Sequence, residues 1–146
     1  MTRACSPARR VLARALAMLV VVAAAPALAQ DPQSILLQKV ARDWLALIDS
    51  QGVLASWSAA GRKFKEAITP DRWGESLQQA RAPFGALDQR TMLATSFSKT
   101  LPGAPDGEYA LVQFRTTFAK KTDVRETVSL EREADGAWRV IGYLIR

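Results

Sequence analysis

"LPGAPDGEYALVQFRTTF", residues 101–118, places two prolines and two glycines directly before a run of strand-forming residues. Proline fixes φ and lacks an amide donor, and glycine accepts conformations that other residues avoid. Residues 101–107 therefore predict a sharp turn. A phosphate-binding glycine loop would lead into a helix, whereas here a strand follows. The residues expected on the buried face of that strand are Ala110, Val112, Phe114, Thr116 and Phe118.

Three further segments are also predicted to be strands, and the last of them is apolar on both faces. Residues 87–100 precede the turn, residues 124–133 follow the strand, and residues 137–146 end the chain. Asp135-Gly136 lies between the last two segments and is typical of a two-residue hairpin turn, because both central positions of such a turn tolerate positive φ. Tight connections between all four segments predict a four-stranded antiparallel meander.

The first half of the chain has helical periodicity instead. Apolar residues recur at helical spacing in residues 33–50, 53–68 and 69–84, although Gly61 weakens the second of these segments. Thr69 is a typical N-cap, and Pro70 suits the first helical position after it. Three helices followed by four strands predict an α+β domain, with three N-terminal helices packed on a curved four-stranded antiparallel sheet.

The first 29 residues have the composition of an export signal. Four arginines precede an apolar run from Leu16 to Ala25, and Ala27-Leu28-Ala29 supplies the small residues that a signal peptidase accepts. We therefore expect cleavage after Ala29, one domain over residues 30–146, and a periplasmic or secreted protein without a membrane anchor. Arg9-Arg10 leaves both the general and the twin-arginine export routes open.

Removal of this leader changes the chemistry that is available. Residues 1–29 hold four of the 20 basic residues and none of the 14 acidic ones, so the mature net charge falls from +6 to about +2. A net charge this small, without a concentrated basic face, disfavours nucleic-acid binding. The only cysteine, Cys5, is lost with the leader, and the chain has no histidine. A disulfide, a cysteine nucleophile, a Ser-His-Asp triad and a Cys/His metal site are thereby excluded, and we expect neither metal nor cofactor.

The segments "DWLALIDSQGVLASWSAAGRKFK", "RAPFGALDQR", "LPGAPDGEYALVQFRTTFAKK" and "DGAWRVIGYLIR" together resemble the bacterial family called domain of unknown function 4019. The resemblance covers nearly all of residues 40–146. It implies an exported protein with a cystatin-like or nuclear-transport-factor-2-like fold. It implies no activity.

Folds of that kind often enclose an apolar pocket, so a small-molecule site is one hypothesis. Aromatic residues that could line it are Trp57, Trp73, Phe114 and Trp138, although aromatic stripes at regular spacing more often belong to a core. Glu126 shares a strand face with Val128 and Leu130, and a carboxylate in a core has a raised pKa unless it is paired. Arg90, Arg115 and Arg139 lie on strands and could supply the partner.

Two functions from different classes follow. The first is an exported binding or protein-interaction module, whose partner is an unknown protein or a small apolar molecule and whose pocket candidates are Trp57, Tyr109, Glu126 and Trp138. The alternative is a cofactor-free enzyme of the ketosteroid-isomerase type, with Asp88 or Glu126 as base and Tyr109 as hydroxyl donor.

Apolar residues on both faces of residues 137–146 also predict a homodimer. Its contacts would involve Ile141, Tyr143 and Ile145, on the face opposite Trp138, Val140 and Leu144.

Overall fold

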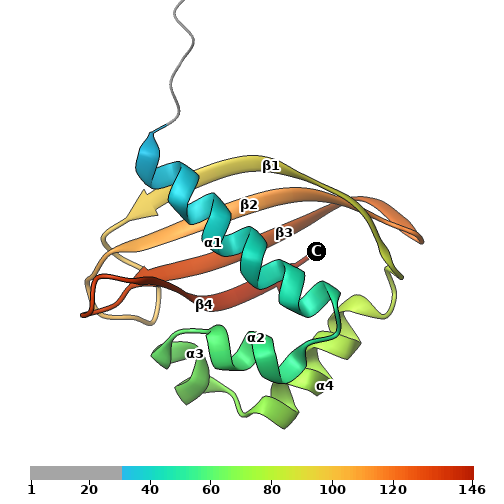
Figure 1. Cartoon of the computed structure of the whole chain (residues 1–146), viewed down its shortest axis with the longest axis horizontal. Coiled ribbons are helices and arrows are strands. Elements are labelled where there is room, and N and C mark those ends of the chain that lie inside the picture. Colours follow the sequence, from blue (N-terminus) through green and yellow to red (C-terminus); the bar gives the residue numbers. More distant parts are fainter. Residues whose placement is uncertain (1–30) are drawn as a thin grey trace, which may run out of the picture.

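A computed structural model describes residues 31–146, so the predicted leader and its cleavage site lie outside the described residues. Four helices precede four strands (Figure 1). The helices are α1 (Pro32–Asp49), α2 (Val53–Ala59), α3 (Arg62–Ala67) and α4 (Pro70–Arg81), and the strands are β1 (Leu87–Ser98), β2 (Tyr109–Phe118), β3 (Lys121–Arg132) and β4 (Trp138–Ile145). The α+β class is confirmed, with one more helix than the sequence predicted.

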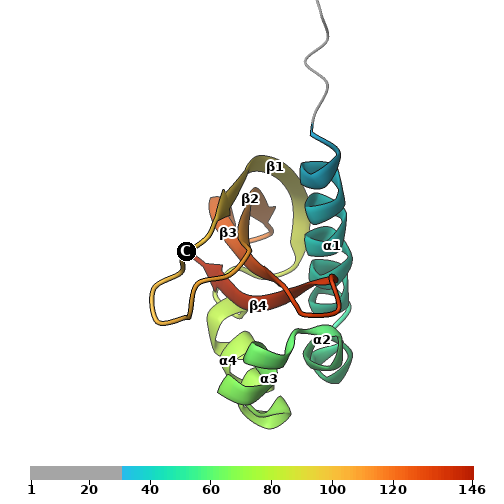
Figure 2. The ribbon, with the colours of Figure 1, turned by 90° about the vertical axis from the view of Figure 1, so that its left-hand side faces the viewer.

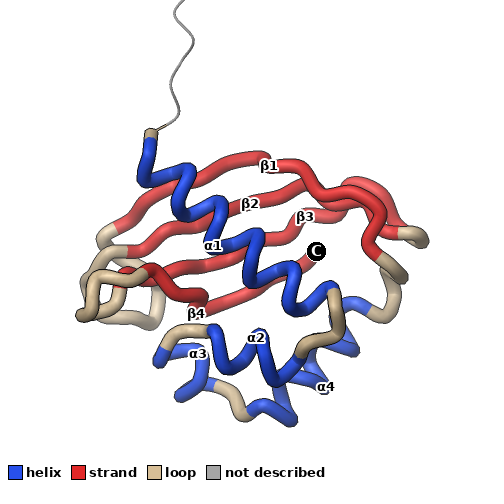
Figure 3. The backbone as a smooth tube through the Cα atoms, viewed as in Figure 1, coloured by secondary structure: helices blue, strands red, loops and turns tan. Residues whose placement is uncertain are grey.

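The strands form one antiparallel sheet in the order β1-β2-β3-β4, which confirms the predicted meander (Figure 3). The turn before β2 is closed by the Gly107 amide, which donates to the Lys99 carbonyl at 2.9 Å, and Gly103 in this turn has a φ of 78°. The connection from β3 to β4 differs from the prediction. Of Asp135 and Gly136 only Gly136 has positive φ, and the Glu133 amide donates to the Ala137 carbonyl, so three residues form the loop.

Helix α1 crosses one face of the sheet, and the three shorter helices gather beside β4 (Figures 1 and 2). Side-chain caps fix where the longer helices begin. The Asp31 carboxylate accepts a hydrogen bond from the Ser34 amide at 3.1 Å, and the Thr69 hydroxyl accepts one from the Arg72 amide at 3.4 Å. Thr69 is therefore the N-cap of α4, and Pro70 occupies the first turn, as predicted.

The core lies between α1 and the sheet. All five residues predicted for the inner face of residues 110–118 are buried, and Glu126, Val128 and Leu130 of β3 are fully buried beside them. An aromatic cluster joins this core to the short helices: Trp44 of α1 lies 5.7 Å from Trp73 of α4, measured between ring centroids, and both contact Tyr143 of β4. Phe64 of α3 packs edge-on against both indoles.

The helix predicted over residues 53–68 is two helices, because the chain straightens at Ala60 and Gly61. The Gly61 amide donates to the Val140 carbonyl of β4 at 2.7 Å. A Cβ at residue 61 would lie 3.3 Å from that carbonyl oxygen and 3.1 Å from Cβ of Arg139. A long-range contact with the edge of the sheet therefore overrides the local helical periodicity.

Strand β4 also departs from simple alternation. Val140 pairs with Leu130, whereas Gly142 pairs with Ser129, so Ile141 is an extra residue in a β-bulge. Beyond the bulge, each side chain of β4 points to the face opposite the one that simple alternation predicts. Tyr143 packs against the core with Val140, and Leu144 is 52% exposed on the other face. The prediction that Tyr143 and Ile145 lie on the face opposite Val140, with Leu144 on the same face as Val140, is wrong, because Ile145 pairs with the buried Glu126 on the inner face and Leu144 lies on the outer face. Tyr143 is not available as a contact on the outer face; the homodimer itself stays a prediction.

Candidate functional site

Four charged side chains meet between α1, α4 and the sheet, and we name them the charge cluster: Asp49, Arg81, Arg90 and Glu126. The Arg90 guanidinium lies between the two carboxylates, with Nη1 2.6 Å from Asp49 Oδ2 and Nε 2.6 Å from Glu126 Oε2. Arg81 Nη2 donates to Asp49 Oδ1 at 2.7 Å. Two positive and two negative charges therefore neutralise one another inside the fold.

Glu126 is the innermost member of the charge cluster, with no exposed surface. Besides Arg90, the Thr116 hydroxyl donates to its Oε2 at 2.5 Å and the Tyr143 hydroxyl donates to its Oε1 at 2.6 Å. Both carboxylate oxygens are thus engaged by neighbours from β1, β2 and β4. A buried carboxylate held in this way is a structural ion pair, and it has no free lone pair directed at a ligand site.

The pKa values of the charge cluster follow from burial and pairing. Burial alone would raise the pKa of Asp49, but the hydrogen bonds and charges of Arg90 and Arg81 outweigh it and lower that pKa. Burial opposes the charged form of Arg90, yet its hydrogen bonds to Asp49 and Glu126 raise its pKa. Burial, followed by the charge of Glu126, raises the pKa of Tyr143, so this phenol stays protonated.

Strand register explains why these residues meet. Arg90 pairs with Thr116 and Phe114 pairs with Glu126, so the side chains of Arg90, Thr116 and Glu126 share the inner face of three neighbouring strands. Asp49 is the last residue of α1 and Arg81 the last of α4, and both helices end above this part of the sheet. The charge cluster therefore connects both helix ends to the sheet.

An open cleft of about 770 Å³ lies beside the charge cluster, between the ends of α1 and α4 and the start of β1. Asp49 and Arg81 belong to its wall. The remaining lining is mainly apolar or small and consists of Ile48, Gln51, Val53, Gly74, Leu77, Gln78, Ala82, Gly85, Ala86 and Leu87. We name this space the α1–α4 cleft.

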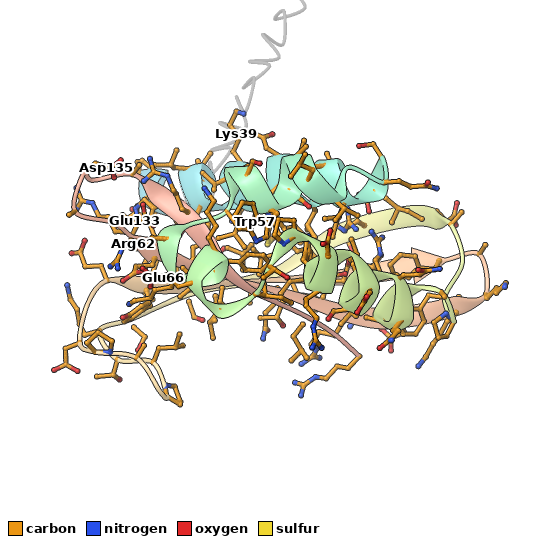
Figure 4. All side chains as sticks on the ribbon, turned by 90° about the horizontal axis from the view of Figure 1, so that it is seen from below. Lys39, Trp57, Arg62, Glu66, Glu133 and Asp135 are labelled. Atoms are coloured by element: carbon orange, nitrogen blue, oxygen red, sulfur yellow. The ribbon has the colours of Figure 1, made fainter. Side chains whose placement is uncertain are left out.

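The structure separates the four pocket candidates that the sequence suggested. Tyr109 and Trp138 line a smaller cleft of about 310 Å³ at the other end of the sheet, with Phe97 of β1. Tyr109 donates its hydroxyl hydrogen to the Pro105 carbonyl and accepts a hydrogen bond from Lys63. Trp57 on α2 (labelled in Figure 4) donates its indole N–H to the Ile68 carbonyl at 2.7 Å and lines neither cleft.

The carboxylates proposed as bases do not meet the proposed hydroxyl donor. Tyr109 pairs with Glu131, five residues along β3 from Glu126, which corresponds to about 16 Å. Asp88 is exposed. The tyrosine that does reach Glu126 is Tyr143, which is partly buried and donates its hydroxyl hydrogen to that carboxylate. This arrangement does not assemble the base and donor that the isomerase hypothesis requires around one pocket.

The family model described as "Protein of unknown function (DUF4019)" matches residues 40–143. The chain belongs to this family. The match confirms the resemblance seen in the sequence, and the charge cluster of this DUF4019 chain lies entirely within the matched range. No curated protein and no solved structure matches the chain.

Sequence reasoning identified Glu126 and named Arg90 among its possible partners, but it missed Asp49, Arg81 and Tyr143. A signal for Asp49 and Arg81 existed, since each ends a helix at a polar position beside apolar core residues. Tyr143 was assigned to the outer face because a bulge cannot be read from alternation alone.

Within residues 31–146, no helix is long and apolar enough to cross a membrane, and no group of three potential metal ligands converges.

Proposed function

We propose that this protein is an exported, periplasmic binding module with a cystatin-like or nuclear-transport-factor-2-like fold, which holds a small apolar molecule in the α1–α4 cleft. The observation that carries the proposal is the cleft itself. Its volume of about 770 Å³ lies in the range of about 300–1,000 Å³ that is usual for ligand pockets. Its wall combines the apolar side chains of Ile48, Val53, Leu77 and Leu87 with two glutamines and the paired Asp49 and Arg81, and ligand sites commonly combine apolar surface with a few placed polar groups.

The pairing of charges on the wall favours an uncharged ligand. Arg81 and Asp49 neutralise each other at 2.7 Å, and Arg90 neutralises the second carboxylate behind them. A charged ligand would therefore find no uncompensated opposite charge in this part of the wall. Apolar surface on Leu77, Val53 and the 37% exposed Leu87 supplies the contact area, which contributes roughly 25 cal/mol for each Å² removed from water.

The wall is also held in place before any ligand arrives. Asp49 and Arg81 connect the ends of α1 and α4, and Arg90 connects Asp49 to the sheet. A site whose walls are already fixed loses less conformational entropy on binding, which favours affinity. The charge cluster thus acts, in this proposal, as a scaffold for the cleft and not as a reactive group.

The cleft can be tested with the uncharged fluorescent probe N-phenyl-1-naphthylamine and the mature protein. Ala82 is exposed and lines the cleft, so Ala82→Trp fills the space without disturbing the core. We expect the wild type to enhance the probe's fluorescence and Ala82→Trp to weaken binding at least tenfold. Ala46→Trp, at an exposed position of α1 outside the cleft, is the matched control and should bind as the wild type does.

Circular dichroism establishes that both variants are folded. Equal affinities for Ala82→Trp and the wild type would place the probe elsewhere and remove the support for this cleft. An equal loss in Ala46→Trp would show that an added indole, and not occlusion of the cleft, changes binding.

A further inference from the structure

Three arginines lie side by side on the face of the sheet that α1 does not cover. Arg115 of β2 pairs directly with Arg125 of β3. The backbone groups of Arg125 and Arg146 exchange hydrogen bonds in both directions, at 2.8 and 3.0 Å, so these two residues are also directly opposite each other. Directly paired residues of antiparallel strands project from the same face. We name Arg115, Arg125 and Arg146 the arginine row.

The burial pattern identifies that face as the outer one. The neighbours of Arg115 in β2, Phe114 and Thr116, are fully buried toward the core. Val124 and Glu126, the neighbours of Arg125, are fully buried as well. Arg115, Arg125 and Arg146 are all exposed. The arginine row therefore points into solvent from β2, β3 and the residue that follows β4, on the opposite side of the sheet from the core.

Few negative charges compensate the arginine row. Asp123 contacts Arg115, with Oδ1 3.0 Å from Nε, and both side chains are more than half exposed. Among residues 31–146, neither Arg125 nor Arg146 forms an ion pair with a side chain. Like charges directly opposite each other on neighbouring strands destabilise a sheet. An anion bound between the guanidinium groups would attract each of them and so offset their mutual repulsion.

The spacing of the arginine row selects the kind of anion. Adjacent strands lie about 4.8 Å apart, so the three positions span about 10 Å in a direction perpendicular to the strands. Guanidinium groups bind phosphate oxygens in a bidentate manner. Carboxylates on one face of an extended peptide recur about every 6.7 Å, so such a peptide places only two of them along the roughly 10 Å of the row. Linked phosphate groups lie closer together and can contact all three side chains at once.

We propose that the arginine row binds an oligophosphate, that is, an anion with several phosphate groups in a chain. Thr91 pairs with Arg115 on β1 but does not extend the row, because its hydroxyl donates to the Arg115 carbonyl at 3.2 Å. This site shares no residue with the α1–α4 cleft and lies on the other side of the sheet. It therefore does not depend on the proposed function.

Inorganic tripolyphosphate is a suitable probe, measured by isothermal titration calorimetry on the mature protein at low ionic strength. Arg125→Gln removes the central guanidinium and should weaken binding at least tenfold. Arg72→Gln removes an exposed arginine from α4 and should leave binding unchanged. Orthophosphate and sulfate should bind at least tenfold more weakly than tripolyphosphate, because each can contact only part of the row.

A thermal measurement keeps the test independent of calorimetry. Without phosphate, Arg125→Gln should raise the melting temperature slightly, because repulsion within the row decreases. Tripolyphosphate should raise the melting temperature of the wild type and of Arg72→Gln but not that of Arg125→Gln. Arg146→Gln serves as a second variant in the event that Arg125→Gln does not fold.

Three results would overturn the proposal. Equal binding of sulfate and tripolyphosphate would show attraction of any anion, and an equal loss in Arg72→Gln would show an effect of net charge alone. Tighter binding of a hexaglutamate peptide than of tripolyphosphate would identify the arginine row as a docking surface for an acidic protein segment instead.

Discussion

Glu126 shows how a charged residue is accommodated in the middle of an apolar sheet face. Its carboxylate has no exposed surface and accepts hydrogen bonds from Arg90, Thr116 and Tyr143. Removal of one member of a buried ion pair is costly because it leaves the other charge uncompensated. The role of Glu126 is therefore to satisfy Arg90 and to hold three strands in register.

Glu126→Gln should lower the free energy of unfolding by about 3 kcal/mol, because Arg90 would keep Asp49 as its only carboxylate partner. Urea denaturation at neutral pH measures this difference. Glu75→Gln, at an exposed position of α4, is the matched control and should change stability by less than about 0.5 kcal/mol. A similarly small effect of Glu126→Gln would mean that the ion pair contributes no net stability.

Tyr143 makes stability depend on alkaline pH. Its pKa is raised in the folded protein, so above the ordinary tyrosine pKa of 10.0 the unfolded chain loses a proton that the folded chain keeps. The unfolded state then binds fewer protons, and stability falls as pH rises through this range.

Denaturation at pH 8 and pH 11 should therefore show a smaller loss of stability for Tyr143→Phe than for the wild type. Tyr109→Phe, which changes the only other tyrosine, is the comparison variant. Equal alkaline losses for Tyr143→Phe and the wild type would contradict the raised pKa.

At the scale of elements, Gly61 determines how the short helices meet the sheet. The chain is extended at this residue, and its amide reaches the carbonyl of Val140 on the edge strand β4. The next amide, that of Arg62, donates to the Glu133 carboxylate at 2.7 Å, so the β3–β4 loop supplies the first hydrogen bond at the start of α3. Figure 4 shows Arg62, Glu133 and Asp135 together at this end of the molecule.

Gly61→Ala should destabilise the protein by about 1–3 kcal/mol, because the new methyl group would be crowded by backbone and side-chain atoms of β4. Gly142→Ala is the matched control, since a Cβ there meets Ser129 at an ordinary contact distance of 3.5 Å. Thermal unfolding followed by circular dichroism compares the two. A melting temperature of Gly61→Ala equal to that of Gly142→Ala would show that the short helices can move away from β4.

The elements that could be predicted from the sequence were those whose local pattern and final packing agree. From Ala110 to Phe118 the residues of β2 alternate and are buried accordingly, and Thr69-Pro70 begins α4 through local chemistry. The predictions that failed depended on contacts distant in sequence. The break at Gly61 requires β4, and the inward side chain of Tyr143 requires the bulge at Ile141. For the site, Glu126 was predictable, whereas Asp49 and Arg81 meet it only after the helices pack.

At the scale of the whole molecule, the sheet separates two candidate binding surfaces. The α1–α4 cleft lies on the side of the helices, and the arginine row lies on the other side. Variants in one surface therefore leave the other intact, and the two proposals can be tested on the same preparation of protein.

Export is the remaining expectation at this scale, and it determines at which residue the mature protein begins. The Ala27-Leu28-Ala29 sequence predicts that the mature protein begins at Gln30, one residue before the cap of α1. Mass spectrometry of the protein recovered from the cell envelope should give a mass that lacks residues 1–29. An intact amino terminus on the recovered protein would be inconsistent with cleavage.

The aromatic cluster of the core gives this protein an optical property of its own. The indole rings of Trp44 and Trp73 lie 5.7 Å apart and are inclined by 34°, which is close enough for their ultraviolet transitions to couple. Such coupling produces a paired positive and negative band whose strength depends on the distance and angle between the rings. Because Trp44 belongs to α1 and Trp73 to α4, the band pair reports directly on whether these two walls of the cleft stay together. A spectrometer can therefore follow the separation of two helices in the unlabelled protein.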